Sequence, residues 1–366
     1  MRILHITNWF PNEFNKNEAI WIKKHIEALS KNTINKVFHF NIIKTRKFKY
    51  SENKHGELNQ TIIGIPFRQW FLFEILYGFW LSYQLIIKKI HKDYDIINFH
   101  IAYPMLTYWN WIKRWIKKPV VITEHWSSYH FNFGVKKKLP RVQKIFQQHI
   151  PIITVSQALA KDIKLFSGAD FQHFVVPNVV DDEMFYFEKD QKRKTYLFMV
   201  SQWKEPKTPI LVMQAFLESE ISFKYSLKIG GYGPLWAEME SFVYRNKAEK
   251  KIELLGLLDS EQIADNMRQC IAFLHPSDYE TFSVVCAEAV ACGAFVIAPN
   301  IGGIPEVVDK NGYLLGENTL NQWKNAFLNI PENFNSNYDK KFSIKNIGYN
   351  YKQVLDEVVG EFKTKK

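Results

Sequence analysis

The sequence predicts two α/β domains, each built on a doubly wound parallel sheet with helices on both faces. The 366 residues are enough for two domains of roughly 150 residues each. Short β-branched runs alternate with helix-length segments along the whole chain, and this alternation occurs twice. Several of the runs are apolar throughout, as expected of parallel strands that are covered on both faces.

The predicted strands fall into one set in each half of the chain. The first set comprises residues 3–7, 37–43, 96–100, 120–123, 152–155 and 174–176, and the second comprises residues 196–200, 226–229, 252–255, 272–275 and 295–298. A Pro/Asn/Asp cluster at 177–183, followed by a charged stretch at 188–194, separates the two sets and indicates a domain boundary.

We therefore predict an N-terminal domain over residues 1–182 and a C-terminal domain over residues 183–345. A last helix is expected within 346–366, over about 347–362, and its packing on the N-terminal domain is left open. The apolar stretch 62–87 contains Arg68, Glu74 and Gln84, which argues against a membrane-spanning helix. A buried helix is predicted there instead.

Cysteine use and the start of the chain indicate a cytoplasmic protein. Cys270, Cys286 and Cys292 form no CxxC pair and offer no disulfide framework, so a reducing compartment is expected. Met1 and Arg2 lead directly into a predicted strand instead of the apolar core of a signal peptide.

Charge is distributed unevenly between the two halves. Residues 1–180 carry 26 Lys and Arg against 11 Asp and Glu, a net charge of +15, whereas the remaining residues have a net charge of −4. Basic runs at 44–50 and 111–118 contain aromatic residues. Because each Lys or Arg near an anionic leaflet contributes about 1 kcal/mol, peripheral binding at the inner face of the cell membrane is one hypothesis, and a solvated basic face is the other. No nucleic-acid-binding motif occurs in the basic half, so nucleic acid is not an expected partner.

Two glutamates after the predicted strand 272–275 form the main candidate site. Glu280 lies in the loop before a helix, and Glu288 lies within that helix. Amides around Thr281, Phe282 and Ser283 are expected to be unpaired at the helix start, where a diphosphate can bind. Glu288 lies about 7–8 Å further along the axis, within reach of a ribose diol.

Other strands of the second half also end in loops suited to a ligand. Glycines follow three of them, at Gly230 to Gly233, at Gly256, and at Gly302 with Gly303. Glycine lets the backbone approach a ligand closely, and such loops lie together at one edge of a parallel sheet. A binding cleft is therefore expected at this edge.

Residues 196–315 resemble the donor domain of glycosyltransferase family 4, a retaining family with the GT-B fold. Its E-x7-E signature is similar to Glu280 and Glu288, its "EAMACG" run to 288–293, and its "GGxPE" to 302–306. The "VGdGP" loop is similar to 229–234 and the "PNGVD…F" hinge to 177–185. The resemblance implies two Rossmann-like domains that face each other across a cleft.

The resemblance also implies a UDP- or GDP-sugar donor, retention at the anomeric carbon, and no metal or other cofactor. Glu288 would hold the ribose, and Glu280 and the amides of 281–283 would face the sugar and phosphates. The family places an Arg and a Lys after its first donor-domain strand; Lys207 is similar to that lysine, but Gln202 stands where the arginine is expected. Gly231 and Gly256 complete the expected donor-binding set.

The acceptor side is expected in the first half. The family carries a histidine after a strand of this domain, and His125 is similar to it, with a ring that could bond to a sugar hydroxyl. Glu280 and His125 are therefore the predicted catalytic residues. The first loop contains Asn8 and Asn17 but no glycine, so side chains must shape the acceptor side there.

These observations predict a retaining glycosyltransferase that acts on a saccharide or lipid-linked acceptor in bacterial-type cell-surface polysaccharide or glycolipid assembly. Two alternatives remain open. A non-catalytic GT-B scaffold docked at a membrane would keep the fold without the diphosphate clamp, which the replacement by Gln202 would permit. A sugar-nucleotide epimerase would share the architecture but use no acceptor.

Overall fold

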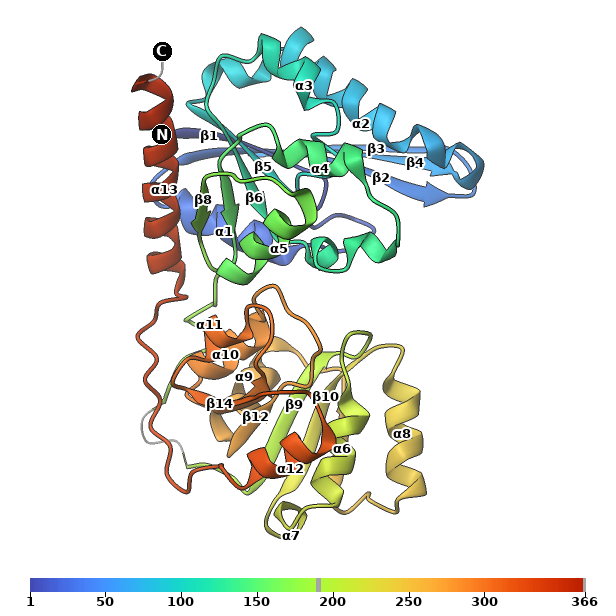
Figure 1. Cartoon of the computed structure of the whole chain (residues 1–366), viewed down its shortest axis with the longest axis vertical. Helices are drawn as coiled ribbons and strands as arrows, with labels where there is room; N and C mark the ends of the chain where they lie inside the picture. Colours follow the sequence, from blue (N-terminus) through green and yellow to red (C-terminus); the bar gives the residue numbers. More distant parts are fainter. Residues whose placement is uncertain (189–191, 365–366) are drawn as a thin grey trace. The chain divides into compact units, whose positions relative to one another are not determined.

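The computed structural model describes residues 1–188 and 192–364, without the side chains of Trp70 and Phe71 (Figure 1). The chain forms two compact units. Unit 1 comprises Met1–Val179 and Ile344–Lys366, and unit 2 comprises Val180–Ser343. This division lies close to the boundary predicted after Asp182. Part of the predicted charged stretch 188–194, namely 189–191, and the last two residues of the predicted segment 346–366 lie outside the described residues.

Unit 1 is built on an eight-stranded sheet of order β3-β4-β2-β1-β5-β6-β7-β8. All neighbours are parallel except β3 and β4. The strands are β1 (Arg2–Thr7), β2 (Ile34–Thr45), β3 (Lys49–His55), β4 (Leu58–Pro66), β5 (Ile96–His100), β6 (Val120–Glu124), β7 (Ile152–Thr154) and β8 (His173–Val175). The sequence patterns missed β3, because this edge strand is polar and mostly exposed.

The predicted buried helix over 62–87 is wrong. Its first residues end strand β4, and a 3-10 helix, η1 (Phe67–Leu72), follows. The α-helix α2 covers only Phe73–Ser82 and continues into the π-helical turn η2 (Tyr83–Ile87). The apolar run was long enough for one helix, but its first part is the parallel neighbour of β2.

The other helices of unit 1 cover both faces of the sheet. They are α1 (Ile20–Ser30), α3 (Trp109–Ile112), α4 (Pro140–Phe146) and α5 (Gln157–Ser167), with short turns η3 (Ile90–Asp93), η4 (Lys113–Trp115), η5 (Ser127–Tyr129) and η6 (Asn132–Gly134). None of the helices in the part of the chain that the structure describes is both long and apolar enough to cross a membrane.

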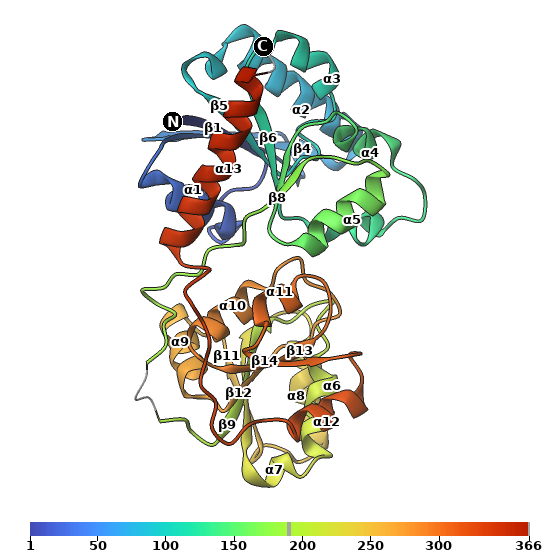
Figure 2. The same cartoon turned by 60° about the vertical axis from the view of Figure 1, so that its left-hand side comes forward.

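The C-terminal helix α13 (Ile344–Thr364) belongs to unit 1 and packs against α1 (Figure 2). Tyr351 reaches the sheet, where its hydroxyl accepts a hydrogen bond from Asn98 at 2.7 Å and lies 2.6 Å from the Thr123 hydroxyl. Gly348 allows the close approach of the two helices, since a Cβ there would lie 2.2 Å from the Ala28 carbonyl oxygen.

Unit 2 is built on a six-stranded parallel sheet of order β11-β10-β9-β12-β13-β14. The strands are β9 (Tyr196–Gln202), β10 (Ser226–Tyr232), β11 (Ile252–Gly256), β12 (Ala272–Leu274), β13 (Phe295–Pro299) and β14 (Gly312–Leu315). The prediction of two parallel-sheet α/β units is thus confirmed. The strand order reverses between β9 and β12, and ligands of open α/β sheets bind where the strands end at such a switch point.

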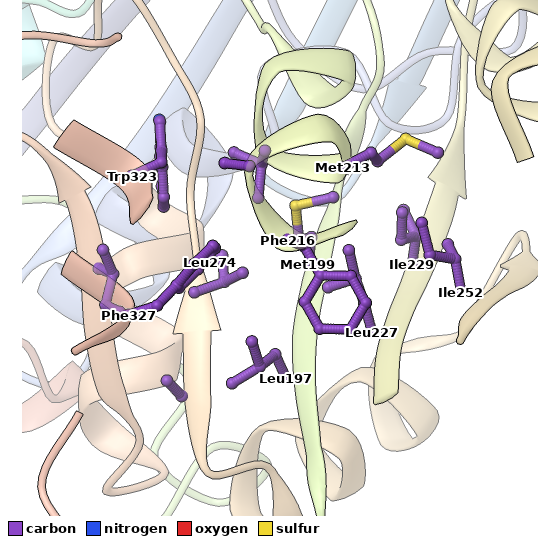
Figure 3. Close-up of a cluster of buried hydrophobic side chains, with 14 of the residues drawn as sticks. Leu197, Met199, Met213, Phe216, Leu227, Ile229, Ile252, Leu274, Trp323 and Phe327 are labelled. Atoms are coloured by element: carbon purple, nitrogen blue, oxygen red, sulfur yellow. The ribbon is translucent and has the colours of Figure 1, made fainter. Parts of the chain in front are cut away.

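The helices of unit 2 are α6 (Pro209–Leu217), α7 (Ile221–Lys224), α8 (Trp236–Arg245), α9 (Ser260–Gln269), α10 (Val284–Ala291), α11 (Ile304–Val308) and α12 (Leu320–Phe327). Of these, α6, α7, α8 and α12 bury a large apolar cluster against one face of the sheet (Figure 3). Leu197 and Met199 of β9 face Phe216 of α6 in this cluster, and Trp323 of α12 is completely buried. The strands are thereby held rigidly beneath the loops at their carboxyl ends.

Substitution of Gly348 by alanine should destabilise unit 1. The added methyl group must push α13 away from the backbone of α1, which costs about 1–3 kcal/mol in a packed interface. Chemical denaturation followed by circular dichroism measures the loss. Gly360→Ala is the matched control in the same helix, because nothing lies within 4 Å of its Cβ position. It should be neutral or stabilising by up to about 1 kcal/mol, and equal losses in the two variants would contradict the packing argument.

Candidate functional site

The loops that follow β9 and β12 are joined by backbone hydrogen bonds at the switch point of unit 2. The Thr208 amide donates to the Pro276 carbonyl at 3.1 Å, and the Asp278 amide donates to the Pro206 carbonyl at 2.9 Å. Lys207 and Ser277 form an antiparallel β-bridge between these two bonds. This pairing aims the Lys207 side chain at the loop that carries Glu280.

Lys207, His275 and Glu280 form one cluster of side chains at this edge. The Lys207 ammonium lies 2.7 Å from Oε1 of Glu280, and His275 Nε2 lies 3.0 Å from the same oxygen. Lys207 also donates to the Ser277 hydroxyl at 3.2 Å. The Glu280 and Lys207 side chains are 21% and 13% exposed, so the pair is largely shielded from water but open on one side.

The electrostatics of the cluster keep Glu280 ionised. Burial by itself would raise the pKa of Glu280, but the Lys207 ammonium and the His275 ring overcome it and lower the pKa to about 2. Burial lowers the pKa of His275, although the Glu280 carboxylate opposes that effect. At neutral pH the cluster therefore holds a carboxylate, an ammonium and a neutral imidazole.

Helix α10 begins immediately beside this cluster. Its N-cap is Ser283, which adopts a left-handed conformation (φ 72°) and directs its hydroxyl to within 3.3 Å of His275 Nε2 instead of capping the helix. The first helical amides are therefore those from Val284 onward, and residues 281–283 form the turn before them. No acidic residue occupies the first turn, so the partial positive charge of the helix start is retained.

The predicted donor residues of this segment differ in how they are placed. The Phe282 side chain is buried against Phe342, so only its backbone can face a ligand. Thr281 and Glu288 are half-buried, with Glu288 one turn beyond the helix start. The sequence predicted unpaired amides at 281–283; the structure moves the helix start to Val284, because Ser283 is the non-helical cap.

Two glycines hold the Glu280 turn against the next loop. The Gly303 amide donates to the Glu280 carbonyl at 2.8 Å. A Cβ at Gly302 would lie 2.0 Å from that same carbonyl oxygen, and one at Gly303 would lie 2.3 Å from the Thr281 carbonyl oxygen. Gly302 also has φ +54°, a conformation that favours glycine. The two glycines therefore position Glu280 through backbone contacts.

Trp203 and the glycines after β10 fix the other side of the site. Trp203 is buried and donates from its indole to the Gly230 carbonyl at 2.8 Å. A Cβ at Gly231 would lie 2.0 Å from the Ser201 carbonyl oxygen, so this predicted donor residue supports the neighbouring loop. Gln202, at the end of β9, is exposed. Gly256 ends the edge strand β11, with open space at its Cβ position.

At the carboxyl edge of the unit 1 sheet, His125 follows β6 and is buried. Neither ring nitrogen of His125 has a partner at full hydrogen-bonding geometry within the described structure. Oδ1 of the buried Asn8 after β1 likewise has no partner in the described residues. Burial lowers the pKa of His125 well below its usual value, although the Asn178 side chain lies close enough to oppose the shift, so the ring is neutral at pH 7. Buried polar atoms without partners are costly and indicate a bound polar ligand or water.

The two predicted acceptor residues differ in burial. Asn8 is buried at the edge of the sheet, whereas Asn17 is exposed in the loop before α1. Asn12 organises that loop instead: its Oδ1 accepts from the amides of Phe14 and Asn15, at 2.9 and 3.1 Å. Asn12 therefore fixes the backbone of this glycine-free loop.

Sequence reasoning did not assign roles to His275 and Ser277. Both lie between the end of β12 and Glu280. Ser277 accepts a hydrogen bond from Lys207, and His275 is hydrogen-bonded to Glu280. A histidine that ends an apolar strand five residues before a candidate glutamate was the available signal.

The three cysteines are buried and unpaired. Burial raises the pKa of all three thiols, that of Cys270 to about 12, so none has the thiolate character of a nucleophile. Over residues 1–188 and 192–364, no group of three or more His, Cys, Asp and Glu side chains is arranged to hold a metal ion.

Replacement of Gly302 by alanine should destabilise unit 2 by about 2 kcal/mol or more, since the methyl group meets the Glu280 carbonyl and the backbone conformation disfavours alanine. Thermal and chemical denaturation measure this loss. Gly316→Ala, in the same unit and with open space around its Cβ position, is the control and should change stability little. A Gly302→Ala protein as stable as the control would show that the two loops are not held together in this way.

The contribution of Glu280 to stability should depend on pH. Its pKa in the folded protein, about 2, is below its ordinary value of 4.5, so the contribution is fully present above pH 4.5 and is lost as the pH falls toward 2. We expect Glu280→Gln to lower the free energy of unfolding by about 2–3 kcal/mol at pH 6. Denaturant titrations of both proteins from pH 6 to pH 3 should show this difference shrinking, and a constant difference would contradict the ion pair.

Two family models match the chain in succession. The model described as Glycosyltransferase Family 4 matches residues 24–184, and the one described as Glycosyl transferases group 1 matches residues 181–343. Together they span both units.

Individual relatives agree with these matches. An uncharacterised glycosyltransferase from Methanocaldococcus jannaschii is 26% identical over 76% of this chain and 81% of its own length. A human phosphatidylinositol N-acetylglucosaminyltransferase chain is 26% identical over 50% of this chain, but the match spans only 41% of the human protein. The Anabaena protein HepE, solved in complex with UDP and glucose, superposes with a TM-score of 0.70 at 15% identity over 98% of this chain and all of its own. The chain therefore belongs to the family 4 type of glycosyltransferases and has the GT-B fold.

Proposed function

We propose that this glycosyltransferase moves a sugar from a UDP- or GDP-sugar to a hydroxyl of a saccharide or lipid-linked acceptor, with retention of the anomeric configuration. The observation that carries the proposal is the Lys207–His275–Glu280 cluster beside the start of α10, at the switch point of the unit 2 sheet. A cation and a helix start at one edge suit a diphosphate, and a fixed carboxylate suits sugar hydroxyls.

In the proposed donor site, the diphosphate lies between the Lys207 ammonium and the first amides of α10. Both supply positive charge to the leaving group in a shielded place, so the reaction is proposed to need no metal. Glu288, one turn further along α10, is proposed to bind the ribose. Gly231 and Gly256 border the site, and Gln202 contributes a hydrogen-bonding amide where the family has a cation.

The transfer step is proposed to take place on one face of the sugar. The bond between the anomeric carbon and the diphosphate oxygen breaks, and a bond to the acceptor oxygen forms on the same face. The acceptor proton passes to an oxygen of the leaving diphosphate. Glu280 is ionised and already held by Lys207 and His275, which favours a role in binding sugar hydroxyls over attack at carbon.

The acceptor side is proposed to lie at the carboxyl edge of unit 1. There the ring of His125, which has no partner at full hydrogen-bonding geometry within the described structure, and the unpartnered amide oxygen of Asn8 offer hydrogen bonds to hydroxyl groups. A lipid-linked acceptor is supported by the human relative, whose name describes transfer to phosphatidylinositol. HepE in complex with UDP and glucose supports a UDP-sugar as donor. We place the reaction in cell-surface polysaccharide or glycolipid assembly, at the cytoplasmic side of the membrane.

Thermal shift measurements with a panel of UDP- and GDP-sugars should identify a donor that raises the melting temperature. With that donor, Glu280→Gln should lower turnover by about a hundredfold or more with little change in donor affinity, because a contact made in the transition state is lost. Glu288→Gln should instead weaken donor binding, measured by calorimetry, by about tenfold.

Glu253→Gln, on strand β11 and outside the cluster, is the control and should keep both donor affinity and turnover. NMR of the product should show the anomeric configuration of the donor. An inverted product would contradict retention, and normal turnover by the Glu280 variant would remove this residue from the site.

A further inference from the structure

An apolar stripe runs along the outer side of α2 and η2. Ile75, Phe79, Tyr83 and Ile87 follow one another at intervals of four residues, so they share one side of the helix. Their exposed fractions are 40%, 71%, 49% and 68%. Single exposed apolar residues are ordinary, but a continuous row of four on one helix indicates a surface with a partner.

The opposite side of the same helix is already used by the core. Tyr77 and Leu81 are buried, and the Phe40 ring of β2 stacks on Trp80 at 4.6 Å. Apart from Glu74, Ser82 and Gln84, this helix is apolar on its inner and its outer side, a pattern typical of helices that are covered on both sides. Within the described part of the chain the inner side is covered and the stripe is not.

Helix α3 and turn η4 lie beside α2 and carry two further exposed aromatic residues. Gly78 of α2 faces the ring of Tyr108, since a Cβ there would lie 2.6 Å from it, and the two helices lie side by side in both views (Figures 1 and 2). Trp111 and Trp115 are 53% and 60% exposed. We call the stripe together with these two tryptophans the aromatic face; its members are Ile75, Phe79, Tyr83, Ile87, Trp111 and Trp115.

Basic side chains accompany the aromatic face. Lys88 and Lys89 follow η2, Lys113 and Arg114 lie between the two tryptophans, and all four are exposed. The Lys88 ammonium lies 5.0 Å from the centre of the Tyr83 ring. Residues 67–92 and 105–118 contain a single acid, Glu74, which is paired with Arg141.

We propose that the aromatic face docks this enzyme on an anionic lipid leaflet. Tryptophan and tyrosine favour the boundary between headgroups and acyl chains, and flanking Lys and Arg favour anionic headgroups by about 1 kcal/mol each. The docking proposal takes only the lipid-linked acceptor from the proposed function. The docking itself is carried by the exposed stripe and its charges.

A second copy of this chain fits the face less well. A symmetric dimer through it would gather both copies of Lys88, Lys89, Lys113 and Arg114 in one interface, where their positive charges repel. An anionic leaflet complements the same charges.

The face is connected to the candidate acceptor edge within unit 1. Glu74, in the first turn of α2, accepts a hydrogen bond from the Tyr103 hydroxyl at 2.9 Å. Tyr103 lies in the loop after β5, at the sheet edge where His100 ends its strand and His125 follows the next one. Docking through α2 would therefore bring that edge close to a membrane-embedded acceptor.

Flotation with vesicles tests the proposal on the full chain. Wild-type protein should float with vesicles of phosphatidylcholine and phosphatidylglycerol, and much less with phosphatidylcholine alone. The triple variant Phe79→Ser, Tyr83→Ser, Ile87→Ser should bind the anionic vesicles about tenfold more weakly or worse, because it loses the inserted side chains. Lys88→Glu combined with Lys113→Glu should abolish the preference for anionic vesicles.

The control carries Phe223→Ser and Tyr244→Ser, which remove side chains of similar exposure, 85% and 78%, from unit 2. It should float like the wild type. Circular dichroism and the donor-induced thermal shift confirm that each variant is folded. A wild-type protein that floats with the vesicles but binds no donor would contradict the proposed function and leave the docking proposal standing.

Four results would overturn the docking proposal. Wild-type protein could remain unbound or bind neutral vesicles equally well, or the triple variant could float like the wild type. Sedimentation could also show that the wild type is a dimer and the triple variant a monomer, with neither protein binding vesicles. That result would assign the aromatic face to a second copy of the chain.

Discussion

The candidate site depends on keeping one carboxylate charged where water has little access. Burial disfavours the ionised form of Glu280, and the Lys207 ammonium at 2.7 Å together with His275 restores it. That pairing is possible only because the loops after β9 and β12 are joined by backbone hydrogen bonds. Gly302 then holds the Glu280 turn from the other side, where any side chain would collide with its carbonyl. The electrostatics of the site are therefore a consequence of backbone packing.

The carboxyl edges of the two sheets differ in how completely their polar groups are satisfied. In unit 2, Lys207, His275 and Glu280 bond to one another, which preorganises the cluster before any ligand binds. In unit 1, both ring nitrogens of His125 and the amide oxygen of Asn8 are buried without partners at full hydrogen-bonding geometry in the described structure. The arrangement in unit 2 suits a site whose fixed charges stabilise the charge that develops during a reaction. The arrangement in unit 1 leaves hydrogen-bonding capacity for hydroxyl groups.

The region between residues 62 and 87 shows how hydropathy alone can mislead. Its length and apolar content predicted one buried helix, but the chain divides it among a strand, a 3-10 turn, α2 and η2. Hydropathy reports that side chains favour an apolar environment and does not distinguish a protein core from another apolar medium. Tyr77 and Leu81 satisfy that preference inside the fold, whereas Phe79 and Ile87 remain exposed.

The sequence by itself determined the α/β class and nearly every interior strand of both sheets, because buried parallel strands must be apolar along their length. It also placed Glu280, Glu288 and Lys207 in loops or helix starts that follow such strands. The polar edge strand β3 carries no such pattern and was missed, and so were β4 and the short edge strand β14. Only the tertiary structure decided that Lys207 and His275 meet Glu280, that Ser283 caps α10 in a left-handed conformation, and that Asn8 is buried whereas Asn17 is exposed. The meeting of Lys207 with Glu280 joins segments that are distant in sequence, so it depends on the order of the strands in the sheet, which no local pattern encodes. The others depend on local backbone conformation and on burial in the folded chain.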